Sequence, residues 1–120
     1  MMSEKKNVLK DKSFGFAIRI INLYKYLTAT KNEYVLSKQL LRSGTAVGAL
    51  VRESQNAESK ADFIHKLAVA QKECDESIYW IELLFQTDYL SSTEYESINN
   101  EATEILKIIR SIIITTKNKS

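Results

Sequence analysis

A long seam of apolar residues between Phe63 and Phe85 constrains the fold of this chain more than any other feature. Its members are separated by 4, 3, 4, 4, 3 and 4 positions, which places them on one face of a single helix. They are Phe63, Leu67, Ala70, Cys74, Ile78, Ile81 and Phe85. A helix with such a seam buries it against other helices. The sequence therefore predicts a helical bundle.

Three other segments show apolar patterns of the same period. The segment nearest the C-terminus repeats at spacings of 4, 3, 4 and 3, and alternation typical of strands is nearly absent from the chain. Four amphipathic helices are predicted in all. The predicted apolar positions of these three segments are Phe14, Ala17, Ile18, Ile21 and Tyr24; Leu36, Leu40, Val47 and Leu50 or Val51; and Ile98, Ala102, Ile105, Ile109 and Ile112.

Capping residues must mark the helix ends, because the 120 residues include no Pro and only three Gly. Residues 30–33 (TKNE) and 91–94 (SSTE) fit capping boxes, and residues 59–62 (SKAD) fit an N-cap with an acidic first turn. We therefore expect a first helix from Ser13 to near Thr30 and a second from there to about Asn56. The third begins at Ser59, and the fourth at Ser91.

The predicted fold is all-α, an antiparallel up-down-up-down four-helix bundle, because short connections between amphipathic helices favour antiparallel neighbours. The bundle is expected over residues 13–116, after a flexible basic tail of residues 1–12 and before a tail of residues 117–120. A hydrophobic fraction of 44% with 27% charged residues is typical of one folded domain. The sequence has no apolar run long enough for a membrane span and no secretory signal, so we expect a cytoplasmic protein.

The chain offers few groups for catalysis. Its one cysteine, Cys74, and one histidine, His65, are nine residues apart, so on one helix they point apart. Cys74 is expected to be buried in the seam, and His65 to lie at the surface. Gly44 and Gly48 lack the Lys-Ser or Lys-Thr of a phosphate-binding loop, and their spacing favours close approach of another helix. No cofactor and no metal site are predicted.

Several charged residues lie near the predicted seams and need partners. A carboxylate there would be stabilised by a guanidinium, so we predict a structural ion-pair network. A solvated helix face and a catalytic carboxylate pair are the alternatives. The network comprises Arg42 and Glu53 of the second helix with Glu73 and Glu76 of the third.

Basic residues crowd both ends of the chain, and an antiparallel four-helix bundle brings these ends together. Nucleic-acid binding requires such a basic patch, although the net charge is only +2. Charged tails that only keep the protein soluble are the alternative. The candidate nucleic-acid-binding residues are Lys5, Lys6, Lys10, Lys12, Lys107, Arg110, Lys117 and Lys119.

Two blocks of the sequence carry a resemblance to a known family. Residues 40–54 read LLRSGTAVGALVRES, and residues 59–67 read SKADFIHKL, followed by KECDES at 72–77 and YWIELL at 79–84. In order and separation they resemble the second and third helices of the bacterial 23S rRNA-intervening sequence proteins. The chain departs from the family pattern at Ala46 and Leu50, where a Ser and an Asn are usual.

The resemblance implies a bundle that assembles into a ring-like homopentamer. It also implies a relation to the accessory proteins of diversity-generating retroelements, which bind a reverse transcriptase and nucleic acid. No catalytic role is implied, and Arg42, Glu53, Glu73 and Glu76 would hold helices or subunits together. We therefore expect a noncatalytic oligomeric binding or scaffold protein that contacts RNA or DNA, or a nucleic-acid enzyme.

Two other functions stay open. One is a protein-protein adaptor without nucleic-acid binding, in which Tyr79, Trp80 and Tyr95 are aromatic anchors. The other is an enzyme that uses Glu53, Glu73 or Glu76 as acid-base groups or metal ligands.

Overall fold

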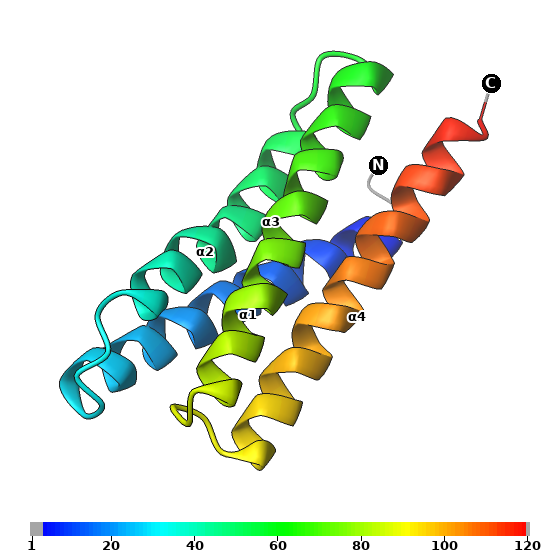
Figure 1. The fold of residues 1–120 in the computed structure, drawn as a ribbon. Coiled ribbons are helices and arrows are strands. Elements are labelled where there is room, and N and C mark those ends of the chain that lie inside the picture. The colour runs from blue at the N-terminus through cyan, green and yellow to red at the C-terminus, as the bar shows by residue number, and fades with distance from the viewer. Residues whose placement is uncertain (1–3, 120) are drawn as a thin grey trace.

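Four antiparallel helices make up the fold in a computed structural model that describes residues 4–119 (Figure 1). They are α1 (Glu4–Ala29), α2 (Leu36–Ser54), α3 (Lys60–Gln86) and α4 (Ser92–Lys117). Each helix packs against the next, and α4 closes back onto α1 to give a rod of 50 × 22 × 19 Å. The predicted all-α, up-down-up-down bundle is confirmed. No helix within residues 4–119 is both long and apolar enough to cross a bilayer.

The first helix differs from the prediction in its start. It begins at Glu4 and not near Ser13, so residues 4–12 are helical and are not a separate tail. Helix α4 ends at Lys117, close to the predicted boundary at residue 116. Residues 1–3 and 120 of the two predicted tails lie outside the described residues.

The buried face of α1 also differs from the prediction. Phe14, Ile18 and Ile21 were expected on the apolar face, yet they are 52%, 47% and 38% exposed. The core instead receives Leu9, Phe16, Ile20 and Leu27. Both sets repeat at helical spacing, so α1 has two apolar faces and periodicity alone cannot decide between them. The face that carries Phe14 is left at the surface.

The start of α2 is also corrected, because the predicted capping box at residues 30–33 does not form. Asn32 adopts a left-handed conformation with φ of 55°, which Asn tolerates better than most residues. The chain then turns so that the Glu33 carboxylate accepts hydrogen bonds from the backbone N–H groups of Val35, Leu36 and Ser37, at 3.1, 2.8 and 2.7 Å. Glu33 thus caps a helix that begins at Leu36.

We predict that Glu33→Gln will lower the free energy of unfolding by about 1–2 kcal/mol at pH 7, because a charged acceptor of three amides is lost. Burial raises the pKa of Glu33, but the hydrogen bonds from the backbone and from Ser37 outweigh it and lower the pKa below its ordinary 4.5. The stabilisation is therefore present above the unfolded-state pKa and is lost as the pH falls through the folded-state pKa. Urea unfolding across pH 3–7 measures it.

The exposed Glu82→Gln makes the same chemical change on α3 and serves as the matched control. Its stability should stay within about 0.5 kcal/mol of the unchanged protein. An equal loss in both variants, or a Glu33→Gln deficit that does not shrink in acid, would contradict the capping role.

The other two predicted helix starts are confirmed. The Ser59 side chain accepts the N–H of Asp62 at 3.0 Å, and Ser91 and Glu94 form a reciprocal capping box. Before that box, Asp88 takes a left-handed conformation with φ of 70°, which reverses the chain after α3 without glycine. The capping residues Ser59 and Ser91 therefore define where α3 and α4 begin.

The core contains most of the predicted seam residues. All five seam positions of α4 are buried, as are Leu67, Ala70, Cys74 and Ile81 of α3, whereas Phe63, Ile78 and Phe85 are half-buried. On α2, the buried positions include Leu40, Val47 and Val51.

The two glycines of α2 lie where α1 crosses this helix. A Cβ atom at Gly44 would come within 2.8 Å of the Ile20 side chain, and one at Gly48 within 3.1 Å of the Ser13 carbonyl oxygen. The predicted close approach of a neighbouring helix at these glycines is confirmed.

Candidate interaction surfaces

The bundle brings the two chain ends together at one end of the rod. Lys5 Nζ of α1 donates to Ser111 Oγ of α4 at 2.5 Å, and Lys12 Nζ lies 2.5 Å from Glu104 Oε1. On α2, Gly48 lies level with Ser13 of α1. These contacts define a terminal half of the bundle, made of residues 4–12, 48–71 and 105–119.

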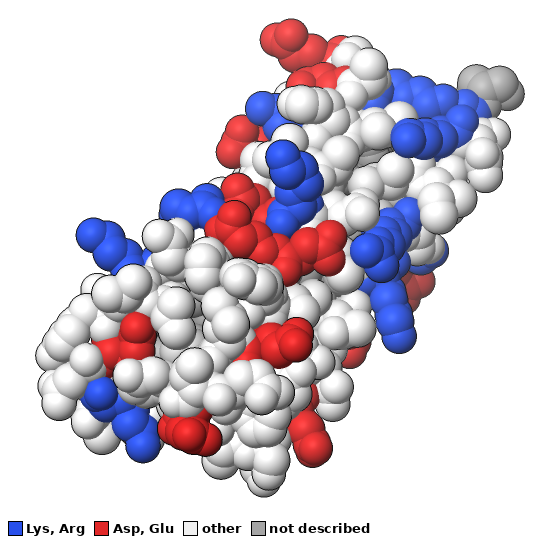
Figure 2. All heavy atoms as spheres, viewed as in Figure 1, with Lys and Arg blue, Asp and Glu red and all other residues white. Residues whose placement is uncertain are grey.

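Charge is divided unequally between the two halves. The terminal half contains eleven Lys or Arg and five Asp or Glu. The other half, made of residues 13–47 and 72–104, contains six Lys or Arg and ten Asp or Glu. The halves therefore carry formal charges of about +6 and −4, which the overall net charge of +2 conceals. In Figure 2, blue side chains gather at the upper right over the end of α4, and most red atoms lie away from it. We call the terminal half the basic end.

The structure places all eight predicted nucleic-acid-binding residues at the basic end, in different surroundings. Lys12 pairs with Glu104, and Arg110 lies 3.9 Å from Asp75. Lys6 Nζ lies 4.3 Å from the centre of the Phe63 ring. Lys107 and Lys117 of α4 and Lys119 after it are exposed.

The structure brings together three of the four residues of the predicted ion-pair network. Arg42 donates to Glu73 through both of its terminal nitrogens, at 3.3 and 3.1 Å, and also pairs with Glu76. Trp80 Nε1 donates to Glu76 at 3.3 Å. Hydrogen bonding to Glu73 is the main influence that raises the pKa of Arg42, so the guanidinium stays charged. This cluster joins α2 to α3.

Glu53 is not part of that cluster. Its Oε1 lies 3.3 Å from Lys66 Nζ, at the basic end. The two side chains are 55% and 32% exposed, and exposed pairs of this kind contribute at most about 1 kcal/mol. Glu53 therefore lies apart from the Arg42 cluster.

Cys74 and His65 have the expected environments. Cys74 is fully buried and its Sγ donates to the Ala102 carbonyl oxygen at 3.3 Å, while His65 is exposed. Burial raises the pKa of the Cys74 thiol to about 12, so the thiol stays protonated at neutral pH. Among residues 4–119, no three His, Cys, Asp or Glu side chains form a group that could hold a metal ion.

Most of the large exposed apolar residues belong to α1 and to the connection that follows it. Of the nine large exposed apolar residues within residues 4–119, seven lie in α1 and in the connection to α2, and the two others are Tyr79 and Ile114. Sequence reasoning missed this surface, although its signal is present as the second apolar face of α1. Phe14, Ile18 and Ile21 lie close together on the side of α1 that borders α2, whereas Tyr26 lies toward α4. We call the surface made of Phe14, Ile18 and Ile21 the α1 face.

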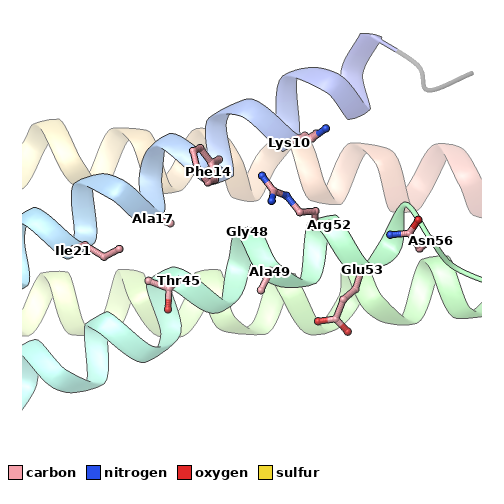
Figure 3. Close-up of a pocket in the computed structure, with 10 residues that line it drawn as sticks. All are labelled: Lys10, Phe14, Ala17, Ile21, Thr45, Gly48, Ala49, Arg52, Glu53 and Asn56. Carbon is pink, nitrogen blue, oxygen red and sulfur yellow. The ribbon is translucent and has the colours of Figure 1, made fainter.

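A groove of about 560 Å³ runs between α1 and α2 beside this face (Figure 3). Its sides and floor are mostly apolar or small, from Phe14, Ala17 and Ile21 of α1 and from Gly48 and Ala49 of α2.

Charged side chains stand at the end of the groove nearer the basic end. The Arg52 guanidinium carbon lies 5.2 Å from the Phe14 ring centre, and Lys10 also lines this end. In Figure 3, Glu53 points away from α1. The groove and the α1 face thus form one apolar surface with a basic edge.

A family model described as 23S rRNA-intervening sequence protein matches residues 5–111. The chain belongs to this family. It is also similar to a crystal structure of a protein with unknown function from the S23 ribosomal protein family of Bacteroides thetaiotaomicron VPI-5482, with 57% sequence identity and a TM-score of 0.90. The similarity covers 91% of this chain and 97% of that one. No curated protein shows significant similarity.

The three candidate aromatic anchors of the adaptor function differ in solvent exposure. Tyr79 is 55% exposed and meets the Trp80 ring edge to face at 5.1 Å. Tyr95 instead stacks on Phe85, with ring centres 4.3 Å apart, and is half-buried. Only Tyr79 of these three aromatic residues therefore presents most of its side chain to solvent.

Proposed function

We propose that this member of the family is a noncatalytic oligomer that binds RNA or DNA through its basic end, alone or together with an enzyme such as a reverse transcriptase. The observation that carries the proposal is the division of charge into about +6 and −4. A positive end attracts phosphate backbones even when the net charge of the chain is small.

Self-association would strengthen this binding. The α1 face exposes three large apolar residues beside the apolar groove between α1 and α2, and such a surface is typical of an interaction site. A homopentamer, as the family resemblance implies, would bury this face and display five basic ends. Linked sites bind one strand with greater overall affinity than a single site.

A noncatalytic role is supported by the surroundings of the reactive groups. The Cys74 thiol is buried and neutral, and Glu53 lies apart from Glu73 and Glu76, whose carboxylates are engaged by Arg42. An acid-base or metal-dependent enzyme would need these carboxylates to converge on a common site.

The test is a fluorescence anisotropy titration of labelled single-stranded RNA at several salt concentrations. We expect affinity to fall roughly tenfold or more between about 50 and 200 mM salt, because phosphate contacts release counterions. The double variant Lys107→Glu, Lys119→Glu should weaken binding roughly tenfold and reduce the salt dependence.

The matched control, Lys25→Glu with Lys38→Glu, makes the same charge change on exposed lysines of the acidic half. It should bind RNA almost as well as the unchanged protein. Equal weakening in both double variants, or binding that ignores salt, would contradict a localised basic site. A pull-down in which the protein recovers one protein partner and no nucleic acid would favour the alternative function of a protein-protein adaptor.

A further inference from the structure

The outer face of α3 presents one large apolar side chain to solvent. This residue is Tyr79, which is 55% exposed. Helices α1 and α3 each pack against α2 and α4, so they occupy opposite corners of the bundle (Figure 1). Tyr79 therefore lies on a different side of the bundle from the α1 face. Exposed aromatic side chains of this kind often become anchors when a protein binds another protein.

Carboxylates stand on both sides of Tyr79 along α3. Asp75 lies about one turn before it and Glu82 about one turn after it, and both are exposed. Asp75 pairs only loosely with Arg110, at 3.9 Å, with about half of each side chain exposed. Lys72, two turns before Tyr79, is the basic residue of this face. The surroundings of Tyr79 are therefore negative on balance, and Figure 2 shows red atoms gathered over the middle of α3.

The groove between α1 and α2 carries the opposite charge. Lys10 and Arg52 stand at its end nearer the basic end, and neither forms an ion pair within residues 4–119. Glu53, which also lines the groove, points away from α1 and pairs with Lys66 (Figure 3). An apolar groove with unpaired cations at one end is complementary to an aromatic side chain that has a carboxylate beside it.

Contacts inside the bundle place Tyr79 at the level of this groove along the rod. Ser77 Oγ donates to Ser43 Oγ at 2.9 Å, and the next residue of α2 lies against Ile20 of α1. Helices α1 and α3 run in the same direction, so Tyr79 and Ile21, which lines the groove, stand at nearly the same level. Two copies side by side at one height would thus bring the tyrosine of one to the groove of the other.

The order of charges also agrees in this arrangement. Asp75 lies on the side of Tyr79 that is nearer the basic end, because α3 runs away from that end. Lys10 and Arg52 lie on the same side of Ile21 in the groove. When the tyrosine of one copy meets the groove of the next, its acidic neighbour therefore faces the cations.

We propose that Tyr79 of one copy enters the groove between α1 and α2 of the next copy, with Asp75 toward Arg52. The inference rests on the proposed oligomer and names the second surface of its interface. The two surfaces are different parts of the chain, so the contact is heterologous and each copy binds two neighbours. A heterologous contact is what a closed ring with an odd number of copies requires.

Cysteine cross-linking tests the contact without altering Tyr79. Ala49 beside the groove and Lys72 on α3 are both exposed, and they lie on different sides of one chain. The double variant Ala49→Cys, Lys72→Cys should give a covalent ladder up to the full oligomer with a short bismaleimide. Either single variant should give no ladder, and a mixture of the two single variants should give dimers. The native Cys74 is fully buried and should not react.

Tyr79→Glu tests the anchor itself by sedimentation velocity. The variant should sediment as single chains, because the groove would have to bury a carboxylate among apolar atoms. Tyr34→Glu makes the same change at a residue that is 58% exposed in the connection between α1 and α2, and it should keep the full mass. Arg52→Glu, which sets a like charge against Asp75, should weaken assembly about tenfold.

The outcomes separate this contact from the proposed function. An oligomer that survives Tyr79→Glu and gives no ladder in the double cysteine variant would overturn the contact and leave Tyr79 as an anchor for another protein. Cross-linking by Ala49→Cys alone would mean that two grooves face each other, which also overturns it. Single chains in the unchanged protein would overturn the oligomer and this contact together, while the RNA titration would still decide the role of the basic end.

Discussion

We expect Ile18→Glu to break the proposed oligomer into single chains of 13.7 kDa. Ile18 is 47% exposed on the α1 face of one chain, so the isolated bundle can accept a carboxylate there. An interface formed by this face would have to bury that charge without a partner, which costs several kcal/mol at every copy of the contact. Sedimentation velocity at micromolar concentration measures the change.

Ile114→Glu is the matched control for this experiment. Ile114 is 60% exposed on α4, outside the α1 face, so the variant should keep the mass of the unchanged protein. Circular dichroism should show the same helix content in both variants. An Ile18→Glu protein that retains the full mass would show that the α1 face is not the interface.

Replacing Phe16 with Ala will lower the free energy of unfolding by about 3–5 kcal/mol, because a fully buried ring is removed and a cavity remains. Phe14→Ala should lower it by less than about 1 kcal/mol in a single chain, since Phe14 is 52% exposed and contacts Arg52 at the surface. Both changes are made in the Ile18→Glu background, so that loss of an interface does not enter the comparison.

Urea unfolding followed by circular dichroism provides the measurement for this pair. The two variants remove the same side chain from positions two residues apart, so helix propensity contributes equally to both. A larger loss at Phe14 than at Phe16 would mean that the face predicted from periodicity, rather than the face observed in the structure, forms the core.

Helices α3 and α4 could be predicted well because their signals agree with one another. Each has one dominant apolar seam, and Ser59 and Ser91 cap their starts as the local sequence indicates. Helix α1 could not be predicted as well, because its two apolar faces have the same period. The start of α2 was misplaced because Glu33 accepts from the amides of the following turn instead of completing a box with Thr30.

The candidate surfaces were predictable only in part. The lysines at both chain ends follow from the sequence and the bundle topology, and so does a partner for Arg42 on the third helix. The α1 face and its groove depend on how α1 rotates where it crosses Gly44 and Gly48, a packing choice that the local sequence does not encode.

The measurement that tests the central claim most directly is light scattering during size exclusion, with absorbance at 260 and 280 nm, in low and high salt. We predict a mass near five times the 13.7 kDa of one chain, with excess absorbance at 260 nm that high salt removes. A mass of one chain with absorbance typical of protein alone, in both salts, would contradict the account.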